Sequence, residues 1–270
     1  MFNSLPHDAD ELMRWSWLHI EPYYRDLEAR KLSAASVTHW LTDWSRLDEC
    51  VNEMLARLSV ATTVNTADEE AERRYKAYLD EIYPAAQAAA QKLKEKLLAS
   101  GLRPDGFEIP LRNMRAEAAL FREANLPLLA EEKKLITEYD KIVGAQTVTW
   151  EGQEVTLLQL QPVYRDPDRT RRERAWRLAT DRWLADRDAI NELWAKFLRL
   201  RKQIAKNADF GDDYRAHRWL QLMRFDYTPD DCAAFQQAIE EVVIPTAIRI
   251  YERRRQRLGV DTLRPWDLHV

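Results

Sequence analysis

The strongest constraint on the fold is a stripe of apolar residues that recurs at steps of three and four in residues 40–58. This spacing places its members on one face of an α-helix of several turns, and so long a stripe has to be buried. Ser33, a residue type that favours helix N-caps, precedes it. We therefore expect a long buried helix whose two tryptophans belong to the core rather than to a ligand cage. The stripe consists of Trp40, Trp44, Leu47, Val51, Met54 and Leu58.

Glycine is scarce, which favours the same fold class. Average usage of about 7% predicts roughly nineteen glycines in a chain of this length, whereas the 270 residues contain 6. Because glycine weakens helices and is needed in turns, its scarcity predicts a mainly α fold, an elongated helical lobe over residues 1–270. Further helices are expected from Asp8 with an interruption at Pro22, from a capping box at Thr66–Glu69 to Gly101 with a kink at Pro84, from Pro110, from Pro127, after Asp166, over Tyr214–Arg224, and from Pro229 with a kink at Pro245.

One segment departs from the helical pattern. Thr147–Trp150 and Gln153–Leu157 alternate β-branched and other side chains, and Glu151 and Gly152 between them fit a tight turn. This pattern is typical of a β-hairpin. Because an isolated hairpin is only marginally stable, we expect this one, at about residues 146–158, to lie on a helical surface or to line a groove.

Charge and polarity argue against several classes of protein. The net charge of −4 and the isoelectric point near 5.9 disfavour a general nucleic-acid or anionic-membrane binder. No run approaches the ~18 apolar residues of a membrane span, and the N-terminus is too polar for a secretory signal. Cys50 and Cys232 fall on apolar helical positions and are expected to be buried thiols rather than a disulfide. These features predict a soluble cytoplasmic protein.

The sequence lacks the motifs of common enzyme classes. It contains no His-Glu-x-x-His, no Gly-rich phosphate loop and no nucleophile elbow. His39 with Asp43, and Asp213 with His217, have the i,i+4 spacing of metal ligands, but each pair offers only two. We expect these side chains to make surface hydrogen bonds instead.

An arginine-rich run at residues 165–174 allows two interpretations. Clustered arginines can bind nucleic acid. However, charges of opposite sign are spaced as ion pairs along one helix, which is typical of a solvated face, and we favour that interpretation. The pairs are Asp168 with Arg172, Glu173 with Arg177, and Arg177 with Asp181.

The last residues, Leu258–Val270, form an extended apolar segment after a well-marked helix end. Pro265 disfavours helical geometry at Arg264, and Trp266 and Leu268 are spaced to share one face of a strand. Because no later strand follows in this sequence, we expect Trp266 and Leu268 to be poorly covered or to be buried by a neighbouring chain. Self-association through this exposed end would be one consequence.

Several blocks of the chain, in the same order, resemble the N-terminal half of oligoendopeptidase F, a branch of the thimet-oligopeptidase-like zinc metallopeptidases. The similarity spans nearly the whole chain, and Leu258–Leu268 is its most specific part. The other blocks are Trp40–Leu47, Thr66–Tyr78, Asp168–Trp183, Leu200–Arg201 with Ile204–Ala205, Phe210–Arg215 and Arg224–Tyr227.

The resemblance implies a two-lobed helical peptidase with a deep channel, in which a zinc-bound water cleaves short peptides. In that family the metal ligands and the general base lie downstream of the block that ends here at Leu268. We therefore expect a channel-forming N-terminal part that has no catalytic, cofactor-binding or metal-binding residues and is inactive without the zinc-binding half. Tyr214, Arg215 and Arg264 are candidates for the channel side, since an arginine can meet a peptide carboxylate or carbonyl. Structural pairing with nearby carboxylates is the alternative for them.

A stand-alone helical binding or scaffold protein, which kept this lobe and lost catalysis, is the competing hypothesis. The coding sequence beyond Val270 separates the two. An open frame that encodes His-Glu-x-x-His favours the peptidase, and an immediate stop favours the scaffold. Short peptides are the expected partners under the first hypothesis, with neither nucleic acid nor membrane involved.

Overall fold

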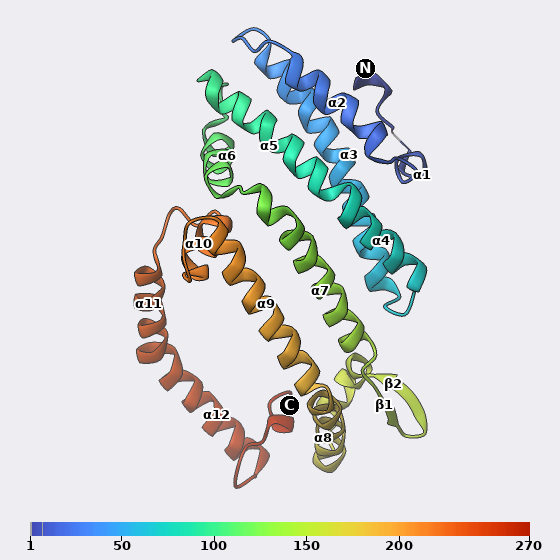
Figure 1. The fold of residues 1–270 in the computed structure, drawn as a ribbon. Coiled ribbons are helices and arrows are strands. Elements are labelled where there is room, and N and C mark those ends of the chain that lie inside the picture. Colours follow the sequence, from blue (N-terminus) through green and yellow to red (C-terminus); the bar gives the residue numbers. More distant parts are fainter. Residues whose placement is uncertain (1, 7) are drawn as a thin grey trace. The chain divides into compact units, whose positions relative to one another are not determined.

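The computed structural model describes residues 2–6 and 8–270 and confirms a mainly α fold with one β-hairpin (Figure 1). The chain divides into two compact units. The first unit comprises Met1–Lys141 and Leu193–Met223, and the second comprises Ile142–Glu192 and Arg224–Val270. Helices α7 (Leu126–Gly144) and α9 (Arg187–Asn207) contribute residues to both. The expected organisation as one lobe therefore stays a prediction.

The first unit is helical throughout its regular structure. Besides parts of α7 and α9, it contains α1 (Ala9–Leu12), α2 (Trp17–Ala29), α3 (Val37–Val64), α4 (Glu69–Glu81), α5 (Tyr83–Ser100), α6 (Glu108–Leu120) and α10 (Tyr214–Gln221), with short 3₁₀ turns η1 (Phe2–Ser4) and η2 (Glu123–Asn125).

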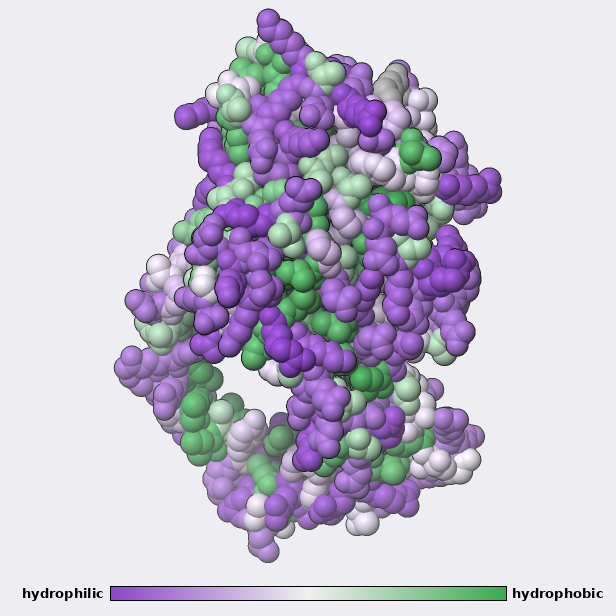
Figure 2. Space-filling model, in the orientation of Figure 1, coloured by the Kyte–Doolittle hydropathy of each residue, from purple (hydrophilic) through white to green (hydrophobic). Residues whose placement is uncertain are grey.

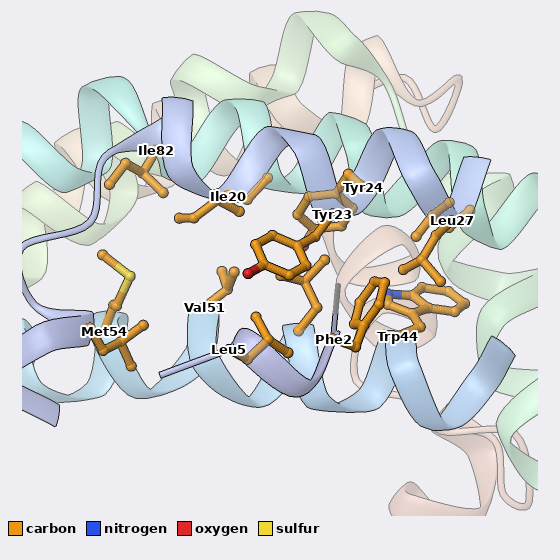
Figure 3. Close-up of a cluster of buried hydrophobic side chains, with 14 of the residues drawn as sticks. Phe2, Leu5, Ile20, Tyr23, Tyr24, Leu27, Trp44, Val51, Met54 and Ile82 are labelled. Atoms are coloured by element: carbon orange, nitrogen blue, oxygen red, sulfur yellow. The ribbon is translucent and has the colours of Figure 1, made fainter. Parts of the chain in front are cut away.

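The predicted apolar stripe forms the centre of this unit. All six of its residues, on α3, are buried. Figure 3 shows Ile20, Tyr23 and Leu27 of α2 pointing toward Trp44 and Val51 of α3. Each such side chain contributes about 1.5–3 kcal/mol on burial. The interpretation of the two tryptophans as core residues is confirmed: Trp40 and Trp44 pack edge to face with ring centroids 5.2 Å apart, and Trp40 Nε1 donates to the Leu27 carbonyl at 2.9 Å.

Several predicted helix starts are displaced. Pro22 lies inside α2, and the chain leaves the helix earlier, between Leu12 and Trp17. The N-cap of α3 is Ser36 rather than Ser33, because the two serine hydroxyls hydrogen-bond to each other at 2.9 Å within a turn before the helix begins.

The predicted capping box at Thr66–Glu69 is also wrong. Asp68 caps α4, and its Oδ1 accepts from the amides of Glu70 and Ala71 at 3.0 and 2.9 Å. A carboxylate favours this position because it also meets the positive end of the helix dipole. Instead of the predicted kink at Pro84 inside one helix, the helix is broken: α4 ends at Glu81, α5 begins at Tyr83, and Pro84 lies in the first turn of α5.

The second unit contains the hairpin. Its strands β1 (Thr147–Trp150) and β2 (Gln153–Thr156) are antiparallel, with Thr147 opposite Thr156 and Trp150 opposite Gln153. The remaining elements are η3 (Leu157–Arg165), α8 (Arg169–Ala185), α11 (Pro229–Ala238), a π-helical turn η4 (Ile239–Val243), α12 (Ile244–Leu258) and a 3₁₀ turn η5 (Pro265–Asp267).

The hairpin lies on a helix, as predicted. Val148 and Trp150 of β1 are buried in one cluster with Ala175 and Ala179 of α8. Small residues at these α8 positions let the strand approach closely. This core is much smaller than that of the first unit: besides these four residues, only Leu160 and Tyr164 complete its buried set.

No helix within residues 2–6 and 8–270 combines the length and the apolar character that crossing a membrane requires. Cys50 and Cys232 are both free and half-buried.

Candidate functional site

The three channel candidates are divided between the units. Tyr214 and Arg215 form the start of α10 in the first unit, where Tyr214 is half-buried and Arg215 is exposed. Arg264 is exposed and directly precedes η5 in the second unit. Only Tyr214 and Arg215 are therefore neighbours in one described unit, and the place of all three on a channel stays a prediction.

A buried ion-pair cluster centred on Asp267 joins η5 to α8 in the second unit. Asp267 is 0% exposed. Arg169 donates to its two carboxylate oxygens from Nε and Nη2 at 3.0 and 2.9 Å, and Arg172 Nη2 donates to Oδ1 at 3.1 Å. The backbone amide of Arg264 donates to Oδ2 at 2.9 Å.

These donors keep Asp267 ionised. The hydrogen bonds from Arg169 are the largest cause of a pKa below the ordinary value of 3.8 for Asp267, and the Arg264 amide and Arg172 act in the same direction. Burial opposes the shift but does not cancel it. The Arg264 backbone thus supports the Asp267 carboxylate, while the Arg264 side chain remains exposed.

Arg172 satisfies several groups at once, although it is only 3% exposed. Besides its bond to Asp267, its Nε donates to the Trp266 carbonyl at 2.8 Å. Its Nη1 donates to the carbonyls of Asp166 and Pro167 at 2.8 and 3.1 Å. A buried guanidinium needs such a full set of partners, because an unpaired buried charge is costly.

The prediction of a solvated, ion-paired face on this helix is therefore wrong for Arg172, which pairs with Asp267 instead of Asp168. Asp168 is the N-cap of α8. The pairing of Glu173 with Arg177 at 2.8 Å is confirmed. Arg171 and Arg174 both pair with Glu151 of the hairpin turn. Arg169, Arg171, Arg172 and Arg174 of this run are thus engaged within the chain, which disfavours nucleic-acid binding by these four side chains.

Two expectations about the segment that contains Trp266 are wrong. The segment is not a strand, because Pro265–Asp267 forms the 3₁₀ turn η5. Nor is Trp266 poorly covered: it is 5% exposed, its ring lies 5.3 Å from that of Trp176 on α8, and the Arg177 guanidinium lies 5.0 Å above it. Leu268, by contrast, is 39% exposed, as expected.

A pocket of about 560 Å³ opens beside this cluster, within the second unit. None of the described residues that line it is Asp, Glu, Lys or Arg. The ring of Tyr164 in its wall stacks on His269 at 5.7 Å, and burial raises the Tyr164 pKa. The pocket suits uncharged groups with apolar faces. It is lined by Val143, Gly144, Gln146, Thr156, Leu157, Leu158, Gln161, Tyr164, Trp176, Ala179, Thr180, Trp183 and His269.

Gln146 contributes a buried side-chain amide to the wall of this pocket. It is 3% exposed, and its Nε2 donates to Asp186 Oδ2 at 2.9 Å. Because a carboxylate only accepts, this bond fixes the orientation of the amide. Its Oε1 is then left buried without a hydrogen-bond partner.

A smaller pocket of about 280 Å³ lies in the first unit beside α10. His217 in its wall is buried against Phe210, with ring centroids 5.4 Å apart. Burial, and then the charge of Arg218, lower the pKa of His217, so its neutral form is favoured. The predicted surface hydrogen bond between Asp213 and His217 is therefore wrong: Asp213 caps α10 by accepting from the Ala216 amide at 2.9 Å.

The other pair with the spacing of metal ligands, His39 and Asp43, lies only partly at the surface. His39 Nε2 lies 3.4 Å from Asp43 Oδ2, but Asp43 is buried and also accepts from Arg30 at 2.6 Å. Among residues 2–6 and 8–270, no group of three or more His, Cys, Asp and Glu side chains could hold a metal ion.

Two family models match the chain. The Peptidase M3 N-terminal domain matches residues 11–108, and Peptidase family M3 matches residues 163–270. Together the two matches cover well over half of the chain. No curated protein matches.

Solved structures share the fold. PZ peptidase A, solved with an inhibitor, is 22% identical with a TM-score of 0.87, over 99% of this chain and 48% of its own. An oligoendopeptidase F is 21% identical with a TM-score of 0.84, over 98% and 47%. The oligoendopeptidase F of Bacillus anthracis is 17% identical with a TM-score of 0.81, over 95% and 48%. The chain thus spans about half the length of these proteins.

Proposed function

The chain belongs to peptidase family M3, and from this we propose that it is the N-terminal, channel-forming part of a zinc-dependent oligopeptidase that hydrolyses short peptides. The observation that carries the proposal is the extent of the fold likeness, which covers nearly all of this chain and about half of each relative. In this proposal the other half supplies the His-Glu-x-x-His helix and its zinc, which acts as a Lewis acid and activates water.

The role proposed for this chain is to admit substrates. A wall that narrows the channel admits short, unstructured peptides and keeps folded proteins from the metal. The exposed guanidinium groups of Arg215 and Arg264 are the proposed contacts for peptide carboxylates or carbonyls, with the half-buried Tyr214 beside Arg215. We place this peptidase in the cytoplasm, with peptides rather than nucleic acids or membranes as its partners.

A peptidase assay tests the proposal. The purified 270-residue chain, incubated with a quenched-fluorescent peptide of about ten residues and zinc, should cleave nothing. Cleavage should appear when the polypeptide that carries the His-Glu-x-x-His motif in the same organism is added. Strong zinc-dependent cleavage by the chain alone would falsify the assignment of the metal site to the other half.

A stand-alone binding or scaffold protein is the second candidate, and one observation favours it. Trp266, in the last segment of this sequence, is covered by α8 of the chain itself. The scaffold predicts no cleavage with or without the added polypeptide, together with a natural stop codon after Val270. Self-association remains a further proposal, with the exposed Leu268 as its apolar contact.

A further inference from the structure

The helical arm of the second unit, residues 229–258, carries a long apolar face without a covering partner. All of these residues are described, and not one side chain of α11, η4 or α12 is buried. Large apolar residues are instead exposed along it, including Phe235 at 67%, Ile248 at 60% and Tyr251 at 47%. Hydrophobic and hydrophilic residues lie side by side on its surface in Figure 2.

The π-helical turn aligns this face. In η4 the amide of Ile244 donates to the carbonyl of Ile239, an i→i+5 bond that adds one residue to the turn. The apolar positions therefore follow at steps of four, five, four and three, and the step of five falls on the π turn. An uninterrupted α-helix would rotate the residues after Val243 by about 100° relative to those before it. The aligned residues are Phe235, Ile239, Ile244, Ile248 and Tyr251.

An amphipathic helix of this kind gains most of its stability from packing rather than from helix propensity. The local turns of the arm are satisfied: Thr228 caps its start, and Gly259, at a φ of +64°, ends it. What the arm lacks is an apolar partner. The hydrogen bonds of a π turn have poorer geometry than those of an α-helix. We attribute the presence of this turn to the alignment that it gives the apolar face.

We propose that this face is the docking surface for the zinc-binding half of the peptidase. The proposal rests on the proposed function and names the contact between the two halves. The match to Peptidase family M3 includes the whole arm. The similar structures contain about as much chain again as the part that matches this one, and that additional polypeptide is the source of the partner.

The charges on the arm disfavour a lipid surface as the occupant. Its acidic and basic side chains are equal in number, five of each, so it offers no net attraction to anionic lipid. Two of its arginines are also engaged at the C-terminal segment, since Arg254 donates to the carbonyl of Leu268 and Arg257 to that of Val270. A protein partner with an apolar groove fits this neutral, amphipathic arm better.

Association of the two halves tests the proposal. The probe is the organism's own polypeptide that carries the M3 His-Glu-x-x-His motif, produced as a separate chain from the point equivalent to residue 270 onward. Binding to the 270-residue chain is measured by calorimetry, and hydrogen exchange reports which amides become protected. The variant Ile248→Asp places a charge in the face, and Gln236→Asp is the matched control at an exposed polar position of the arm.

We expect the wild-type chain and Gln236→Asp to bind equally, Ile248→Asp to bind at least tenfold more weakly, and the amides of 229–258 to become protected. Circular dichroism should show that both variants keep their helices, because Ile248 contacts little in the free chain. Equal binding by all three chains would overturn the docking surface and leave the proposed function standing. Failure of the wild-type chain to bind would overturn both. If the free chain forms a dimer or binds lipid vesicles, and Ile248→Asp abolishes that binding, the face docks a second copy or a lipid surface. Either result would overturn the zinc-binding half as its partner.

Discussion

Arg172 and Asp267 are 95 residues apart in the sequence and form an ion pair of 3.1 Å in which both side chains are buried. The pair fixes η5 on the first turns of α8. Arg172 also donates to the carbonyl of Trp266, so the same guanidinium fixes the backbone next to the buried indole. The pair thus joins the two segments of the second unit, Ile142–Glu192 and Arg224–Val270.

The variant Asp267→Asn should destabilise the second unit strongly. It removes the negative charge from between Arg169 and Arg172 and leaves a buried cation without its counter-ion. Breaking a buried pair in this way costs about 3–5 kcal/mol. Hydrogen exchange of the α8 amides, which reports local opening, measures the loss.

The matched control is Glu173→Gln, which removes an ion pair from the exposed side of the same helix. Glu173 bonds Arg177 at 2.8 Å, but such pairs contribute about 0–1 kcal/mol. Equal losses of amide protection in the two variants would show that the buried cluster stabilises the second unit no more than an exposed ion pair does.

Local sequence patterns were enough to predict most of the fold. The apolar stripe on α3 and the turn at Gly152 each depend on residues close together in the chain, and both predictions are confirmed. The N-caps were less certain, because Ser33, Ser36, Thr66 and Asp68 are all suitable residue types. Only the hydrogen bonds in the folded chain select among them.

The buried cluster could not be predicted in this way. Arg172 has the spacing of a surface ion pair with Asp168, and nothing local distinguishes it from its exposed neighbours. The one signal was the segment Leu258–Leu268, which resembles its family most closely and contains both Trp266 and Asp267. The pattern of a strand misled because Pro265 begins a 3₁₀ turn instead.

The Asp267 cluster should also give the second unit a defined acid sensitivity. The pKa of Asp267 is lowered in the folded chain, so its contribution to stability is fully present above the ordinary value of 3.8. The contribution is lost as the pH falls from there through the lowered folded value. Acid titration followed by tryptophan fluorescence should show a transition in this window that is absent in Asp267→Asn.

His217 should titrate below its ordinary pKa of 6.5, because burial disfavours the imidazolium. The unfolded chain then takes up the proton first, so the contribution of the neutral His217 to the stability of the first unit is lost as the pH falls below 6.5. An NMR titration of the imidazole signals, assigned by the loss of one signal in His217→Gln, checks this. A titration at or above 6.5 would contradict the buried placement.

The hairpin turn should be sensitive to the side chain at residue 152. Glu151 and Gly152 both have positive φ, 51° and 83°, as a type I′ turn requires. No atom would meet a Cβ at Gly152, so Gly152→Ala should cost only backbone strain, about 1 kcal/mol. Gln153→Ala, at an exposed position of β2, should cost much less. Thermal unfolding of both variants makes the comparison, and equal effects would exclude a backbone cause.

The burial of Trp266 leads to a prediction that separates its ring from its N–H group. Trp266→Ala should cost about 3–5 kcal/mol, because it leaves a cavity against Trp176 and removes the ring under Arg177. The indole Nε1 is buried without a hydrogen-bond partner, so Trp266→Phe loses no bond and removes an unsatisfied donor. We expect that variant to lie within about 1 kcal/mol of the wild type. Leu268→Ala, at a 39% exposed position, is the control for a general effect of trimming this segment. Chemical denaturation measures all three, and a loss in Trp266→Phe as large as that in Trp266→Ala would mean that the N–H group has a partner in solution.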